Sequence, residues 1–250
     1  MLSKEQLIQE DDYLFPYHYI AELTANNIQL SKRWGWAVNY LGRIEILLSS
    51  LKKKTFSNFC DIGCGDGRLI SLLAPKYPDK KFLGIDYSSR AIGLATALNR
   101  APNAEFRYHD LLKEKTATQF DGISLIEVLE HIPPSHLSDF VAKAAAILKP
   151  SGFAIITVPS NNMPLVKKHF QHFDLKKIQT VVEDAGLKVE DARYIDGSDL
   201  LFRIMRKIIY NDKIAIESAF FNRAFFDYYQ KNLLQNHPKG NGVYLLCTNP

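Results

Sequence analysis

Two carboxylates and an imidazole stand close together in the stretch LIEVLEHIPPSHL, at Glu127, Glu130 and His131. Their spacing is i, i+3 and i+4, so in a helix all three lie on one face. Side chains of these types transfer protons or bind metal ions. The structural alternative is that Glu130 only caps a turn. Which role applies depends on the elements that position the group.

A glycine-rich turn lies upstream, in the heptapeptide DIGCGDG at residues 61–67. Its three glycines allow the backbone to turn sharply and to approach a ligand closely. A strand that ends in such a turn delivers ligands to the carboxyl edge of a parallel sheet. The next predicted strand ends at Asp86, whose carboxylate can accept both hydroxyls of a ribose. The turn and the acid together predict a nucleoside-type ligand, and the sequence has no GxxxxGK[ST] motif of a P-loop enzyme.

Alternating strand and helix patterns begin at residue 58 and predict an α/β fold. Predicted strands cover residues 59–63, 81–88, 104–111, 121–129, 153–160, 187–195 and 242–249. Predicted helices cover residues 67–78, 89–102, 136–152 and 174–186, and the last begins at Asp174 and ends at Gly186. Residues 1–57 predict a helical, aromatic extension that acts as a cap or substrate wall, and a helical insertion at about 197–238 precedes the last strand.

The composition is that of an ordinary globular chain: 250 residues, 46% hydrophobic and 23% charged, with a net charge of +4. No run of like charges indicates a nucleic-acid tail. Cys60, Cys64 and Cys247 fit neither a disulfide framework nor a zinc site, and reduced thiols predict a cytoplasmic protein. The N-terminus lacks the features of a signal peptide, and no apolar run approaches the roughly 18 residues of a membrane span.

These motifs resemble those of the class I S-adenosylmethionine-dependent methyltransferases, over roughly residues 58–190 and the last strand. The resemblance implies an enzyme with a Rossmann-like sheet of seven strands, helices on both faces and an antiparallel last strand. In that family the glycine-rich loop wraps the methionine part of the cofactor, and acids after the second and third strands contact the ribose and the adenine. Carried over to this sequence, the cofactor-binding residues are Asp61, Gly63, Cys64, Gly65, Gly67, Asp86, Tyr87, His109, Asp110, Leu111 and Glu127.

A further resemblance is to the small-RNA 3′-terminal 2′-O-methyltransferases, in which an ExxEH block and a histidine from a later DHxFEW-type loop hold a divalent ion. The matching metal ligands here are Glu127, Glu130, His131 and His172, and with the neighbouring His169 they form the predicted catalytic set. Carboxylates and imidazoles suit Mg²⁺, Mn²⁺ or Co²⁺, and such an ion lowers the pKa of an attacked hydroxyl. This sequence departs from the family: DHxFEWTR reads QHFDLKKI, and no separate RNA-binding domain is visible.

The predicted function is therefore methyl transfer from S-adenosylmethionine to a hydroxyl of a small-molecule, sugar, glycan or polyol-type acceptor, assisted by magnesium or another divalent cation. Three alternatives stay open. They are methylation of an RNA 3′ end, metal-independent methylation of a small molecule or phosphoryl group with His131 or His169 as general base, and a non-catalytic cofactor-binding subunit. Tyr17, His18 and Tyr19 are predicted substrate residues, and the aromatic insertion is predicted to form a lid, a substrate wall or a homodimer face.

Overall fold

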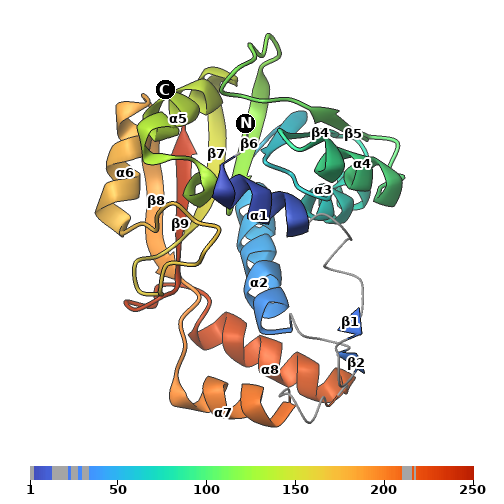
Figure 1. Ribbon diagram of the computed structural model, residues 1–250, viewed down its shortest axis with the longest axis vertical. Coiled ribbons are helices and arrows are strands. Elements are labelled where there is room, and N and C mark those ends of the chain that lie inside the picture. Colours follow the sequence, from blue (N-terminus) through green and yellow to red (C-terminus); the bar gives the residue numbers. More distant parts are fainter. Residues whose placement is uncertain (1–2, 13–21, 24–27, 30–33, 210–215, 217) are drawn as a thin grey trace.

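Seven strands form one sheet in the order β5-β4-β3-β6-β7-β9-β8 in a computed structural model of the chain (Figure 1). The structure describes residues 3–12, 22–23, 28–29, 34–209, 216 and 218–250. The strands are β3 (Asn58–Ile62), β4 (Lys81–Asp86), β5 (Ala104–Tyr108), β6 (Phe120–Ile126), β7 (Leu148–Pro159), β8 (Lys188–Ile195) and β9 (Gly242–Thr248). Only β9 runs against the others, between β7 and β8. The predicted sheet and its antiparallel last strand are confirmed.

Side chains cap the starts of several helices. Ser88 caps one helix by accepting a hydrogen bond from Ala91 N at 3.1 Å, and Asp174 caps another by accepting one from Lys177 N at 2.7 Å. The helices that follow the strands are α3 (Arg68–Leu73), α4 (Ser89–Leu98), α5 (Leu137–Ala146) and α6 (Leu175–Asp184). The predicted helix start at Asp174 is thus confirmed.

The sheet has an apolar core on each face, because successive side chains of a strand point to opposite sides. On β7, Phe153 and Ile155 belong to one core, and Ala154 and Ile156 to the other. The second core contains residues of α5 and α6. The first contains residues of α3 and of three further helices, α2 (Trp34–Leu51), α7 (Leu200–Ile209) and α8 (Ala219–Asn232).

The N-terminal extension and the insertion therefore share a core with the sheet. Helix α8 lies between α2 and α7 (Figure 1), and a Cβ placed on Gly42 of α2 would come 2.7 Å from Tyr229 of α8. The extension also contains α1 (Lys4–Asp12) and a two-stranded sheet of β1 (Glu22–Leu23) and β2 (Ile28–Gln29). It was predicted to be helical, and the small sheet is a departure from that prediction. Within the described residues, no helix is long and apolar enough to cross a bilayer.

Glu127, Glu130 and His131 do not lie on one face of a helix, and the strand predicted for residues 121–129 ends three residues early. Strand β6 ends at Ile126, and Glu127 then takes a left-handed backbone conformation, with φ of +59°. A single 3-10 turn, Leu129–His131, follows. Proline disfavours helical conformation in the residue before it, and the pair Pro133-Pro134 prevents the turn from growing into a helix.

Two helical glycines test how tightly α8 packs on α2. Gly93 of α4 has nothing within 4 Å of an added Cβ, whereas Gly42 faces Tyr229. We expect Gly93→Ala to raise the free energy of unfolding by about 0.5–1 kcal/mol, through loss of backbone entropy in the unfolded chain. Gly42→Ala should lower it by about 1–3 kcal/mol, because the buried ring cannot move away without strain. Urea unfolding measures both, and equal effects of the two substitutions contradict the packing described.

Candidate active site

A cavity of about 640 Å³ opens at the carboxyl edge of the sheet. That volume lies in the usual range for a small-molecule or cofactor site. The loops after β3, β4, β5 and β6 supply most of its wall, and α1 contributes Gln6 and Gln9. Helix α1 is held by a capping box, in which Ser3 Oγ accepts from Gln6 N at 3.2 Å and Gln6 Oε1 accepts from Ser3 N at 2.9 Å. The N-terminal extension thus forms one side of the site.

The glycine-rich loop after β3 needs its glycines for two physical reasons. Gly63, Gly65 and Gly67 have φ of +72°, +55° and +77°, which side-chain-bearing residues rarely adopt. There is also no room for a side chain, because a Cβ on Gly63 would lie 2.6 Å from Val128 Cγ2. The loop therefore meets the cavity with bare backbone at Gly63.

Asp86, at the end of β4, fixes the shape of that loop. Its Oδ2 accepts a hydrogen bond from Gly65 N at 3.0 Å, and its Oδ1 accepts one from Ser88 N at 2.9 Å. The residue is almost fully buried and still lines the cavity. The carboxylate predicted to bind a ribose is thus also a brace between two loops.

Three buried carboxyls give this side of the site an acidic character. Burial raises the pKa of Asp61 to about 7, although the Ser124 hydroxyl donates to it at 2.6 Å. Burial likewise raises the pKa of Asp86 to about 6 and that of Asp66 to about 6. Each group favours a nearby positive charge when it ionises.

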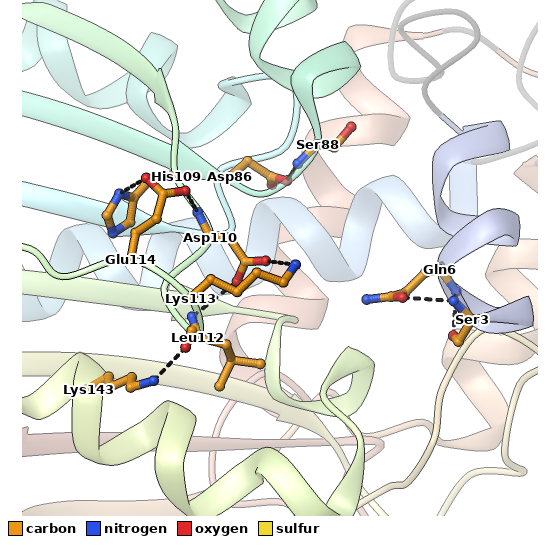
Figure 2. A network of polar contacts seen from close by, with 10 residues as sticks. All are labelled: Ser3, Gln6, Asp86, Ser88, His109, Asp110, Leu112, Lys113, Glu114 and Lys143. Carbon is orange, nitrogen blue, oxygen red and sulfur yellow. Dashed lines mark hydrogen bonds and ion pairs between the residues drawn. The ribbon is translucent and has the colours of Figure 1, made fainter. Parts of the chain in front are cut away.

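Residues of the loop after β5 form another wall of the cavity (Figure 2). Asp110 Oδ2 lies 2.5 Å from Lys113 Nζ, and its Oδ1 accepts from Leu112 N at 3.1 Å. His109 shares a hydrogen bond of 2.8 Å with the Thr116 hydroxyl. The predicted cofactor residues Tyr87, His109, Asp110 and Leu111 all line the cavity, whereas Cys64 is a buried thiol whose pKa is raised by burial.

A buried arginine, Arg43 of α2, pairs with Glu127 in the wall of the cavity. Its Nη1 lies 2.6 Å from Glu127 Oε2, and its Nη2 lies 2.7 Å from Asp196 Oδ2. The Tyr229 hydroxyl donates to Asp196, and the Thr157 hydroxyl donates to Glu127 at 3.1 Å. Burial alone lowers the pKa of Arg43, but Asp196 and Glu127 outweigh it and hold the pKa above its usual value. The predicted catalytic residue Glu127 is therefore one member of a buried ion-pair network.

No motif in the sequence marks Arg43 or Asp196 as site residues. The only local signal was a basic residue inside the apolar stripe of a predicted helix. Asp196 follows β8 and shares with Glu127 a left-handed backbone, with φ of +61°. No sequence pattern relates these two positions, because the contacts are long-range.

Two loops meet beside this network and bring a carboxylate and imidazoles together. The Phe170 N–H, in the loop after β7, donates to the carbonyl of Glu130 at 2.9 Å. Ligand-type atoms of Glu130, His131 and His169 all lie within 4.8 Å of one another. Glu130 is fully buried, and among the described residues neither of its carboxyl oxygens has a hydrogen-bond partner. Burial, and then the charge of Glu127, raises its pKa well above the usual range.

Hydrogen bonds indicate how the histidines are protonated. His172 Nδ1 lies 3.2 Å from the carbonyl of Met163, so it carries the proton. His172 Nε2 therefore accepts from His169 Nδ1 at 2.9 Å, and the lone pair of His169 is on Nε2. His131 Nδ1 donates to the carbonyl of Lys168 at 3.0 Å, and its Nε2 lies 3.8 Å from Glu130 Oε1. Burial lowers the pKa of His169 to about 2, so this ring is neutral.

The structure thus distributes the predicted metal ligands differently from the sequence. Glu130 and His131 lie together with His169, whereas His172 lies one layer behind as the partner of His169. Glu127 is paired with Arg43. The predicted substrate residues Tyr17, His18 and Tyr19 lie outside the residues that the structure describes.

Known proteins share both this fold and parts of this sequence. Residues 37–192 match the family described as a methyltransferase domain. A ubiquinone biosynthesis O-methyltransferase from Paraburkholderia phymatum is 31% identical over 107 residues, which cover 41% of this chain and 44% of that relative. This chain therefore matches less than half the length of that relative.

Two solved structures show the fold over nearly the whole chain. The N-methyltransferase NodS from Bradyrhizobium japonicum WM9, in complex with S-adenosyl-L-homocysteine, has a TM-score of 0.65 at 16% identity, covering 99% of this chain and 100% of NodS. The [4+2]-cyclase SpnF has a TM-score of 0.61 at 16% identity, covering 99% of this chain and 96% of SpnF.

The seven-stranded sheet, the glycine loop and the family match together define a methyltransferase-domain fold. The match covers more than half of the residues and begins within α2, before the boundary at residue 58 drawn from the sequence. The chain belongs to the methyltransferase-domain family.

The acidic side of the site predicts a stability that depends on pH. The native chain keeps protons on Asp61, Asp66 and Asp86 up to pH about 6–7, whereas an unfolded aspartate releases its proton near pH 3.9. These groups should therefore lower the free energy of unfolding of the ligand-free protein as pH rises from about 4 to about 7. Urea unfolding of Asp86→Asn over this range should show a shallower decline than the wild type. Asp79→Asn, at an exposed residue, is the control, and an unchanged slope in Asp86→Asn contradicts the assignment.

The ion-pair network predicts a large difference between two arginines. Arg43→Met leaves two carboxylates without their buried partner and should lower the free energy of unfolding by about 3–5 kcal/mol. Arg107, which pairs with Glu105 on the surface at 2.5 Å, is the matched control, and Arg107→Met should cost less than about 1 kcal/mol. Adding Asp196→Asn to Arg43→Met should restore part of the loss. Similar losses for the two arginine variants contradict this role of Arg43.

Proposed function

We propose that this chain transfers the methyl group of S-adenosylmethionine to a hydroxyl of a sugar or other polyol, with a divalent ion at the reaction centre. The observation that carries the proposal is Glu130. A buried carboxylate without hydrogen-bond partners costs several kcal/mol unless a positive charge compensates it. The imidazoles of His131 and His169 lie beside it, and one carboxylate with two imidazoles makes a set suited to a divalent cation.

The spacing of these side chains would suit one divalent ion. With ligand bonds of about 2.1 Å, the ligand atoms would lie about 3–4 Å apart. The ligand atoms of Glu130, His131 and His169 all lie within 4.8 Å of one another, so small movements would bring them to these values. Three protein ligands would leave room for substrate oxygens. In the proposed ligand set, His169 therefore takes the place of His172. Glu127 is not a ligand in this set, because it pairs with Arg43.

Each side chain around the centre then has a definite task. His172 orients the His169 ring through its hydrogen bond, as residues behind metal ligands commonly do. Arg43 holds Glu127 at the wall of the cavity next to the acceptor. The acidic carboxyls and the glycine loop hold the positively charged cofactor, which supplies the methyl group. When bound, the divalent ion lowers the pKa of the acceptor hydroxyl, so that an alcohol is methylated at neutral pH.

Two observations bear on the alternatives. A histidine with a pKa of about 2 is a weak general base at neutral pH but a good neutral ligand, which favours the metal-assisted reaction over a metal-free one with His169 as base. A hydroxyl acceptor is in line with the relative named as an O-methyltransferase. The cyclase SpnF shares the fold, so the fold by itself does not decide the reaction.

A labelled-methyl transfer assay distinguishes the acceptors. The panel contains free sugars and polyols, lipid-linked sugars, and small RNAs with free 3′ ends, each with and without excess chelator. Transfer to sugars or polyols that chelator abolishes supports the proposal. Transfer to RNA alone identifies ribose methylation, transfer unaffected by chelator identifies the metal-free reaction, and tight cofactor binding without transfer identifies a non-catalytic subunit.

The proposed ligands give a sharp prediction. Glu130→Gln and His169→Ala should each lower the turnover rate by about a hundredfold or more, because activation and positioning of the alcohol fail together. His172→Ala should weaken Mn²⁺ binding by about 10–100-fold, because it only orients a ligand. S-adenosylmethionine affinity should change little in all three variants. Calorimetry with Mn²⁺ and with the cofactor measures both affinities.

His237→Ala is the control, because this histidine follows α8 and lies outside the cluster. It should keep the wild-type turnover and Mn²⁺ affinity. Mn²⁺ binding that survives in Glu130→Gln and His169→Ala contradicts the ligand set.

A further inference from the structure

Helix α7 has an apolar surface much wider than its contact with the core requires. Its buried residues include Phe202 and Ile209. A second set of apolar side chains on α7, here called the apolar row, is exposed: Leu200, Leu201, Ile204 and Ile208, at 65%, 49%, 45% and 59%. At about 100° per residue, the apolar row occupies an arc of about 100° beside the buried one. Four large exposed hydrophobic residues on one helix indicate an interaction surface.

The inner face of α7 packs against α8. The Phe202 ring stacks on Phe225 at 4.7 Å and on Tyr229 at 5.4 Å between centroids, and both partners belong to α8. All three rings are nearly inaccessible to solvent. The helix is therefore anchored by one face, and the apolar row is not needed to hold it in place. Helix α7 also lies at the outer edge of the molecule, with α8 between it and α2 (Figure 1).

Basic residues occupy the rest of the α7 surface. At about 100° per residue, Arg203, Arg206 and Lys207 occupy the remaining arc, between the buried face and the apolar row, and α7 contains no acidic residue. Arg203 and Arg206 form no ion pair with any residue that the structure describes. At the start of α8, Phe220 and Phe221 add exposed aromatic rings, at 76% and 50%. The combination of an apolar arc, a basic arc and nearby aromatic residues is typical of helices that lie in the interface of a membrane.

We propose that α7 and the start of α8 form a docking surface for an anionic lipid bilayer. The apolar row and the two phenylalanines enter the boundary between headgroups and acyl chains, and the basic residues contact lipid phosphates. The surface brings the enzyme to a membrane without crossing it. This inference does not depend on the metal or on the hydroxyl acceptor, so it stands or fails separately from the proposed function.

Charge favours a bilayer over a second copy of the chain as the occupant. In a two-fold contact through α7, the basic arcs of both copies approach each other, and α7 has no acid to pair with them. The nearby Asp227 already faces Arg223, with 3.8 Å between their charged atoms. An anionic bilayer compensates the same arginines directly, and the net charge of +4 adds long-range attraction.

Vesicle flotation tests the proposal with the full chain. One set of vesicles is phosphatidylcholine alone, and the other contains one third phosphatidylglycerol. We expect binding to the anionic vesicles only, weakening as salt is raised. Ile204→Ser/Ile208→Ser should weaken binding about tenfold or more through lost apolar burial. Arg203→Gln/Arg206→Gln should weaken it about thirtyfold at low salt.

Controls separate docking from misfolding and self-association. Leu98→Ser removes an apolar side chain of 43% exposure at the end of α4, and Arg107→Gln removes an exposed arginine on β5. Both should float like the wild type, and all variants should keep its thermal unfolding midpoint because the replaced side chains are exposed. Three outcomes overturn the proposal: no binding to anionic vesicles, equal loss in the control variants, or a stable dimer in solution that Ile204→Ser/Ile208→Ser dissociates.

Discussion

Burial of Arg43 is the constraint on which the rest of the site depends. A guanidinium in the core is tolerated only with carboxylates against it, and here these come from Glu127 after β6 and Asp196 after β8. Both acids have a left-handed backbone, a costly conformation that surrounding contacts must hold. One cation thus links the N-terminal extension, the end of β6 and the insertion. The acceptor side of the cavity is shaped by parts of the chain that ordinarily vary most, its extensions and loops.

The site divides its charges between two sides. On the cofactor side, buried carboxyls with raised pKa values surround the glycine loop and favour a cation. On the other side, Arg43 compensates Glu127 and leaves Glu130 as the carboxylate without a partner among the described residues. The two glutamates stand three positions apart in sequence yet have different electrostatic surroundings. Arg43, contributed by α2, makes that difference, so the extension sets the electrostatic surroundings of the two glutamates.

Local patterns predicted the sheet, because hydrophobic periodicity and glycine turns depend only on residues that are close together in the sequence. The cofactor loop and Asp86 followed for the same reason. The strand predicted for residues 121–129 runs only to Ile126, and the helical face considered for Glu127, Glu130 and His131 does not form because Pro133 and Pro134 stop the turn after three residues. Arg43 and its acids were not predictable, since the charge pair joins residues 153 positions apart. His169 and His172 exchanged roles because the hydrogen bond between Phe170 and Glu130 sets the register of two loops, which no motif specifies.

The position of β9 has a consequence for how the chain folds. Strand β9 lies between β7 and β8, and in the described sheet β8 pairs with no other strand. Until β9 has been synthesised, one edge of β7 therefore stays unpaired and β8 makes none of its backbone hydrogen bonds to a neighbouring strand. Unpaired strand edges can bind other chains and promote aggregation. Gly242, the first residue of β9, also packs near Arg43, where an added Cβ would lie 3.2 Å from Nη2. The arrival of one late strand thus completes both the backbone pairing and the enclosure of the buried charge. This sheet is finished last in its interior, and not at its edge.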